Sequence, residues 1–172
     1  PSVAKRAITI STGIIPNIMD KTEQYLTDLK SEDPSIRASA TRALWVFWHG
    51  QLGPELEKEL NDGTALMDNE QPEKALEIFM SLVERYPDYS EAHNKLATLL
   101  FMMDQFEEAA LECEEVLKQI PHHFGALNGM GLCLFDLRRY EEAIVCFQKA
   151  LQVQPYAKIN LTYIARCRAN LN

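Results

Sequence analysis

Three prolines, Pro87, Pro121 and Pro155, are evenly spaced along the sequence, and other residue types recur with the same spacing. Small residues recur at Gly63, Ala97 and Gly131. Leucine recurs three positions after each of them, at 66, 100 and 134. A fixed period of about 34 residues is typical of chains built from repeated supersecondary units, each of which buries its apolar face against its neighbours. The period therefore constrains the fold more tightly than composition does.

Each unit has the pattern of two helices. In the first half of a unit, apolar or small residues recur at three- and four-residue steps, as in His93, Leu96, Ala97, Leu100. The second half repeats the pattern, as in Ala109, Cys113, Val116, Leu117. Proline then ends the second helix, because it lacks the amide donor that a helix needs. We predict that the small residues let paired helices approach closely and that Phe79 and Phe147 fill the space between pairs.

Because of these recurring positions, residues 56–155 resemble three tetratricopeptide repeats. The resemblance assigns the repeats to 56–89, 90–123 and 124–157 within a region spanning 55–157, and a capping helix to 158–172. It implies an all-α fold, a right-handed superhelix of antiparallel helix pairs (an α-solenoid). The usual large residue of the first helix is replaced at Glu59 and His93 and kept at Leu127.

Residues 1–54 are predicted to form a separate helical hairpin with a flexible start. Pro16 can open its first helix, and Asp33 can cap a second one that begins at Pro34. The segment 33–44 is also similar to the second helix of a HEAT repeat, and a plain amphipathic hairpin that caps the array is the alternative. The apolar run 44–48 is expected to pack on the first repeat, against Leu56, Leu60 and Leu66. Basic, acid-free composition before Asp20 is compatible with the trailing edge of an organelle transit sequence or with a flexible tail.

Composition excludes several classes of function. The net charge of −8 removes the broad positive field that nucleic acid requires. No apolar run approaches the roughly 20 residues that cross a bilayer. The four cysteines form no Cys-x-x-Cys pair and are expected to be buried thiols of an intracellular, reducing compartment, the cytoplasm or alternatively a plastid or mitochondrial interior.

No pattern of catalytic residues, phosphate-binding loop or metal ligands is present in the sequence. The pair His122-His123 follows Pro121 in an inter-repeat turn and is expected to be solvated. We therefore predict a protein that is not an enzyme, with no cofactor, no metal and no catalytic residue.

The family resemblance implies a partner-binding concave groove lined by the first helices of the repeats. Register places the following residues there: Leu60, Thr64, Met67, Glu91, Asn94, Thr98, Phe101, Asn128, Leu132, Phe135 and Arg166. Asn94 and Asn128 are equivalent in successive repeats, and an amide that both donates and accepts suits an extended peptide backbone.

The family's carboxylate clamp grips the acidic carboxy-terminus of a chaperone with Lys, Arg and Asn. The places for those basic groups hold Leu60, Thr64, Gly125 and Gly129 in this chain. Acidic residues at the groove positions, Glu57, Asp68, Glu91 and Asp136, favour a neutral or basic partner.

The function predicted from sequence is thus a non-catalytic scaffold or adaptor that binds a protein or peptide segment in the concave groove and is not of the chaperone carboxylate-clamp type. The alternative is a self-associating structural module, a homo-oligomer or a chain whose own amino-terminal helices fill the groove.

Overall fold

The computed structural model describes the backbone of residues 15–172 and the side chains of residues 21–172. The predicted flexible start of the chain lies outside the described residues. Nine helices and no strand occur within the described part, which confirms the predicted all-α class. The helices are α1 (Ile15–Asp28), α2 (Pro34–His49), α3 (Pro54–Asp68), α4 (Pro72–Arg85), α5 (Ser90–Met102), α6 (Phe106–Gln119), α7 (Phe124–Asp136), α8 (Tyr140–Val153) and α9 (Lys158–Leu171). Over the described residues, no helix is long and apolar enough to cross a membrane.

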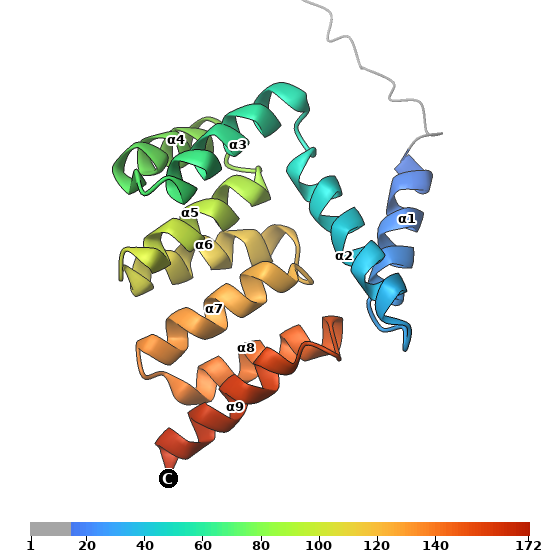
Figure 1. Ribbon diagram of the computed structural model, residues 1–172, viewed down its shortest axis with the longest axis vertical. Helices are drawn as coiled ribbons and strands as arrows, with labels where there is room; N and C mark the ends of the chain where they lie inside the picture. The colour runs from blue at the N-terminus through green and yellow to red at the C-terminus, as the bar shows by residue number, and fades with distance from the viewer. Residues whose placement is uncertain (1–14) are drawn as a thin grey trace, which may run out of the picture.

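Helices α3 to α9 stack in chain order as successive antiparallel pairs (Figure 1). The pairs are α3 with α4, α5 with α6, and α7 with α8, and α9 packs against α8. Helices α4, α6 and α8 end at Arg85, Gln119 and Val153, two positions before the three periodic prolines. The proline spacing thus sets the length of each helix pair.

Close packing between paired helices depends on the small residues of the period. A Cβ atom on Gly63 would lie 2.7 Å from the Phe79 ring, and one on Gly131 would lie 2.6 Å from the Phe147 ring. Both phenylalanines are buried. The predicted role of the two positions is confirmed: glycine lets an aromatic ring of the second helix rest directly on the backbone of the first.

The turns inside the repeats share a conformation that is unusual for the residues present. Glu70, Asp104 and Arg138, which are equivalent in the three repeats, have positive φ angles of 56°, 59° and 59°. The amide after each of them bonds to the carbonyl five positions earlier, as in Gln105 N to Leu100 O at 2.9 Å. This 6→1 bond is the Schellman motif, which usually places glycine at the left-handed position. Each first helix is therefore closed by a strained non-glycine residue.

A partly buried ion pair joins α5 to α6. Nδ1 of His93 lies 2.6 Å from Oε2 of Glu112, and Nε2 lies 3.0 Å from the Pro87 carbonyl. Burial on its own lowers the pKa of His93, but the hydrogen bond and the charge of Glu112 outweigh it, so the pKa is raised above the ordinary 6.5. Protonated His93 therefore stabilises the second repeat.

The amino-terminal hairpin of α1 and α2 lies beside the array and not on its end (Figure 1). Asp33 caps α2 as predicted, accepting from the Ser35 amide at 2.8 Å. The prediction that the run 44–48 packs on Leu56, Leu60 and Leu66 is wrong. Leu44 and Trp48 instead join a cluster with Leu29, Ala40 and Phe124.

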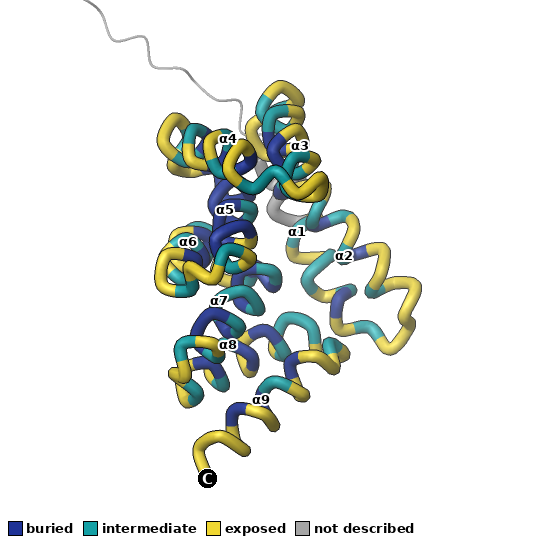
Figure 2. The backbone as a smooth tube through the Cα atoms, turned by 60° about the vertical axis from the view of Figure 1, so that its left-hand side comes forward, coloured by how far each residue is buried: buried dark blue, intermediate teal, exposed yellow. Residues whose placement is uncertain are grey.

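The reason for this difference lies in the turn between α2 and α3. Gly53 adopts a φ of 95°, and its amide bonds to the Gly50 carbonyl at 3.1 Å, so the chain folds back there. Helix α2 therefore does not stack on α3 but lies along the side of the array (Figure 2). At its far end, Gln154 donates to Thr41 at 3.5 Å and Arg37 lies 4.1 Å over the Tyr156 ring.

We predict that Asp104→Gly raises the free energy of unfolding by about 0.5–1 kcal/mol, because glycine adopts positive φ without the steric cost that aspartate bears. Urea denaturation measures the change. The matched control is Glu108→Gly, which also removes one acidic side chain but lies in helical backbone, and it should lower stability by about 0.5–1 kcal/mol. Equal effects of the two substitutions would contradict the strain argument.

The His93–Glu112 pair predicts a pH dependence. A histidine whose folded pKa is raised contributes stability that is fully present below the unfolded value of 6.5 and is lost as pH rises through the folded pKa. The stability lost in Glu112→Gln should therefore be larger at about pH 6 than at about pH 9. Denaturation curves of Glu108→Gln, on the exposed part of α6, provide the control. A loss that does not change with pH would show that His93 stays neutral.

Candidate functional site

The first helices of the second and third repeats enclose a small apolar pocket. Its volume is about 100 Å³. Four of the predicted groove residues line it: Asn94, Thr98, Phe101 and Leu132. The remaining lining consists of Ala97, Cys113, Gly125, Gly129 and Cys133. The structure therefore brings together the central part of the predicted groove, between α5 and α7.

Two glycines of α7 belong to the lining of this pocket. Gly125 and Gly129 lie one helical turn apart and so face the same side. A Cβ atom on Gly129 would lie 3.0 Å from Sγ of Cys113, and one on Gly125 would lie 2.7 Å from Cη2 of Trp45. The missing side chains let Cys113 of α6 approach the backbone of α7 at one position and a tryptophan of α2 approach it at the other.

A second group of predicted residues lies at the carboxy-terminal side of the array. The Arg166 guanidinium stands 4.6 Å over the Phe135 ring and 4.8 Å over the Tyr163 ring. Burial raises the pKa of Asp136, while the charge of Arg166 opposes that shift. Arg166 is thus held by cation–π contacts at α7 and α9, where it can meet polar or aromatic groups.

The other predicted residues have different surroundings. Leu60 is fully buried in the core of the first two repeats, and half-buried Met67 packs against that core. Thr64 donates to the Leu60 carbonyl at 2.9 Å. Oδ1 of Asn128 is buried and accepts no hydrogen bond from any described residue. Leu60 therefore belongs to the packing of the array and does not lie on an open surface.

Glu91 also lies in the interior, where its carboxylate is the centre of a polar network. It is 0% exposed. Oε1 accepts from Nε2 of His123 at 2.8 Å, and Oε2 accepts from Nδ2 of Asn94 at 3.2 Å. Nδ1 of His123 accepts from the Ala126 amide at 3.0 Å, so the ring donates through Nε2 and is neutral. The Glu91 carboxylate is therefore not exposed on the surface of the groove.

The expected solvation of His123 is likewise wrong, since His123 is 0% exposed. It serves as the N-cap of α7, and that position turns its side chain inward against α2. The ring centroid lies 4.1 Å from that of Trp48 and 5.4 Å from that of Trp45. Aromatic rings of α2 therefore cover the Glu91–His123 bond and exclude water from it.

The end of α2 is tied to the same network. Nδ1 of His49 donates to the Trp45 carbonyl at 2.8 Å and lies 3.8 Å from Oε2 of Glu91. Tyr89 donates to the His49 carbonyl at 2.6 Å. Burial, with the charges of Glu91 and Glu57, raises the pKa of Tyr89, which keeps this hydroxyl protonated as a donor. The amino-terminal hairpin is thus fastened to α5 and α7 by hydrogen bonds as well as by apolar packing.

Comparison with known sequences gives the family of this helical array. Two models, both described as tetratricopeptide repeat, match residues 60–123 and 125–156, which together are more than half of the chain. The chain belongs to the tetratricopeptide repeat (TPR) family. A TPR repeat-containing protein of Rhizobium etli is 26% identical over 104 residues, which are 60% of this chain and 51% of that protein. The chain therefore spans about half the length of the curated relative that it matches.

Solved TPR domains share the fold of the array. The Sgt2 TPR domain from Aspergillus fumigatus superposes with a TM-score of 0.64 at 20% identity, covering 69% of this chain and 80% of that one. The first TPR of Spaghetti (RPAP3) bound to the HSP90 peptide SRMEEVD gives 0.64 at 16% identity, covering 66% and 90%. The TPR2B domain of yeast Sti1 in a complex with pHsp70 gives 0.61 at 14% identity, covering 66% and 95%. The likeness confirms the TPR solenoid fold.

Sequence reasoning missed the residues contributed by the hairpin. Trp45 and Trp48 were expected on the first repeat, and Glu91 was assigned to the groove surface. One available signal was the position of His123, shortly after a periodic proline and directly before the first helix of a TPR, where an N-cap is needed. Another signal was the spacing between Glu91 and His123 along the sequence, which is close to one repeat length.

We predict that Glu91→Ala lowers the free energy of unfolding by about 2–3 kcal/mol, because it leaves the His123 and Asn94 donors buried without an acceptor. Both tryptophans of the chain lie at this junction, so intrinsic fluorescence during urea denaturation measures the effect where it arises. Glu55→Ala, at an exposed site in the first turn of α3, is the control and should change stability by less than about 0.5 kcal/mol. Equal losses in the two variants would contradict the network.

Proposed function

We propose that this TPR protein is a non-catalytic adaptor that holds an extended segment of a partner protein on its concave face. The observation that carries the proposal is the pocket between α5 and α7, whose lining includes Asn94, Thr98, Phe101 and Leu132 and two glycines. A volume of about 100 Å³ is of the size that an apolar side chain fills. One such side chain of the partner would occupy it.

Polar groups beside the pocket support contacts with a peptide backbone. Nδ2 of Asn94 is engaged by Glu91, which turns the amide oxygen away from that carboxylate. Oδ1 of Asn128 has no donor among the described residues. A backbone N–H of a partner is a suitable donor for the Asn94 oxygen, whereas Oδ1 of Asn128 is buried and lies out of a partner's reach.

The electrostatics of the groove favour a neutral or basic segment over an acidic one. Gly125 and Gly129 stand where a carboxylate clamp needs basic side chains, and half-buried Glu57 and exposed Asp68 and Asp136 stand at predicted groove positions. Arg166 is occupied with two aromatic rings. The acidic peptide SRMEEVD, which a solved TPR domain of the same fold binds, is therefore not the kind of ligand that we propose.

A second candidate function, self-association, is favoured by one observation. Val46 and Phe47 of α2 are 71% and 39% exposed, so the hairpin presents an apolar surface away from the array. A second copy of the chain could cover it. Light scattering over a range of concentrations separates the candidates, because an adaptor with an open groove stays monomeric.

The groove proposal predicts that Thr98→Trp weakens peptide binding about tenfold or more, since Thr98 is exposed at the pocket and the larger side chain fills it. The probes are peptides selected from a random display library on the wild-type protein, with affinities measured by fluorescence anisotropy. SRMEEVD serves as the acidic comparison and should bind far more weakly.

The matched control is Thr27→Trp on α1, because Thr27 is also exposed and, like Thr98, donates to the carbonyl four positions earlier. It should leave affinity unchanged. Selected peptides that bind Thr98→Trp as tightly as wild type would contradict use of this pocket. Tight binding of SRMEEVD would contradict the proposed charge preference.

A further inference from the structure

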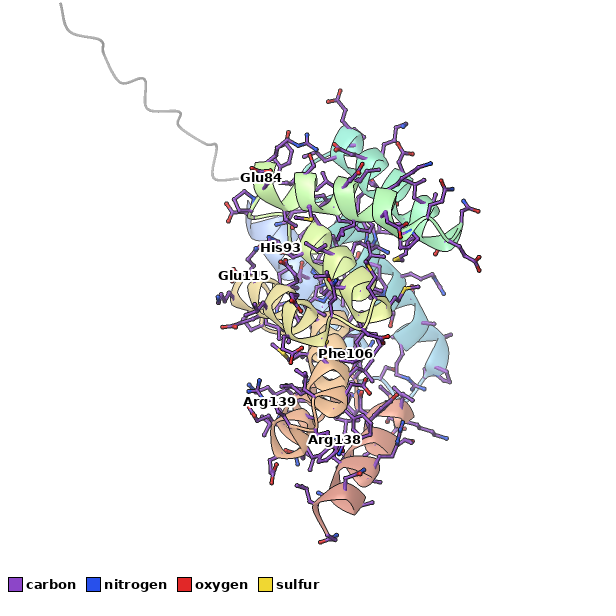
Figure 3. All side chains as sticks on the ribbon, turned by 90° about the vertical axis from the view of Figure 1, so that its left-hand side faces the viewer. Glu84, His93, Phe106, Glu115, Arg138 and Arg139 are labelled. Atoms are coloured by element: carbon purple, nitrogen blue, oxygen red, sulfur yellow. The ribbon has the colours of Figure 1, made fainter. Side chains whose placement is uncertain are left out.

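The face of the array opposite to the groove has a larger apolar depression. It lies between the second helices α6 and α8, over α7, and its volume is about 520 Å³. Figure 3 shows Glu115 of α6 and Arg139 at the start of α8 on this face of the molecule. Met130 and Leu134 of α7, and Leu137 directly after it, form part of its lining. We call it the α6–α8 groove.

Two exposed apolar side chains lie in this groove at equivalent positions of successive repeats. Leu111 is 61% exposed and Val145 is 49% exposed. The equivalent residue of the first repeat is Glu77, which is exposed and polar, as expected for a solvent-facing helix position. The apolar substitution is therefore confined to the two repeats that form the groove.

Carboxylates border the apolar strip along α6. Glu107 and Glu114 line the groove on either side of Leu111, within one helical stripe. Lys118 pairs with Glu115 at 2.7 Å and Glu114 at 3.6 Å. Among the described residues, no cationic group lies within 4 Å of Glu107 or Glu108. On α8, Arg139 is bound by both oxygens of Glu142, at 2.7 and 2.6 Å.

We propose that the α6–α8 groove binds an amphipathic helix of a partner protein whose apolar stripe is flanked by Lys or Arg. A helix laid in a groove between two helices contacts it through residues at i, i+3, i+4 and i+7. The two bordering helices have 14 residues each, so the groove offers about 20 Å of length, enough for about four turns. The acidic border along α6 selects basic flanks by charge complementarity.

This site is independent of the concave groove, because the two lie on opposite helices of each pair. Leu111 and Val145 belong to second helices, whereas Thr98 and Leu132 belong to first helices. An adaptor with both sites would bring an extended segment and a basic helix together on one rigid array.

The test uses a fluorescent Leu/Lys peptide of about 18 residues, with leucine at helical i, i+3, i+4 and i+7 positions, and measures its anisotropy with the full chain. The double variant Leu111→Asn with Val145→Asn should weaken binding about tenfold or more. The control is Met80→Asn, an equally exposed apolar site on α4 outside the groove, which should bind as wild type does. Thr98→Trp should also bind normally, which distinguishes this site from the proposed concave site.

Two further measurements keep the proposal falsifiable. Glu107→Gln with Glu114→Gln should weaken binding and reduce its dependence on salt, and methyl NMR signals of Leu111 and Val145 should shift on peptide addition. Equal affinity for a scrambled peptide without a leucine stripe would overturn the proposal, because general charge attraction would then explain binding. Self-association that disappears in the Leu111/Val145 double variant would also overturn it, by assigning the groove to a second copy.

Discussion

The position of the amino-terminal hairpin relative to the repeat array depends on the hydrogen bonds of one carboxylate, that of Glu91, which is buried at the start of α5. A buried carboxylate costs several kcal/mol unless hydrogen-bond donors compensate it. The compensating donors come from Asn94 on the same helix and from His123, which caps the next first helix. The Glu91–His123 bond joins the start of α5 to the start of α7, and the Trp48 ring lies over the imidazole. We infer that this network specifies the position of the hairpin as well as contributing to stability.

The same cluster determines how much of the concave face is open. Trp45 packs where Gly125 has no side chain, so α2 closes the end of the groove nearest the start of α7. Beyond it lies the pocket between α5 and α7, with Asn94, Phe101 and Gly129 in its lining. In the function that we propose, the hairpin therefore limits the length of segment that the concave face can hold at this end.

Much of the array could be predicted because its packing is local and periodic. Glycine opposite phenylalanine, as in Gly131 and Phe147, and proline after each second helix are rules that act within one repeat. The course of α2 could not be predicted, because it depends on one backbone angle at Gly53 and on contacts with His123 and Phe124, which are distant in the sequence. Glu91 was expected on the surface because charged side chains are seldom fully buried unless paired, and the partner His123 stands at the far end of its repeat. The left-handed backbone conformation of the turns inside the repeats could not be predicted for a different reason, because the residues that adopt it are not glycine.

The contacts described above show where the acidic residues that give the net charge of −8 lie in the structure. Residues 55–119 carry 17 acidic against 5 basic side chains, yet Glu91 is internal and Glu112 is paired with His93. Of the remaining carboxylates of α6, Glu107 and Glu114 line the groove beside exposed Leu111, where a bound apolar surface would reduce their screening by water. On the concave face, by contrast, the pocket itself is lined by apolar and uncharged polar residues. In the two proposals, the pocket on the concave face selects an apolar side chain by its shape, whereas the acidic border of the α6–α8 groove selects basic flanks by charge.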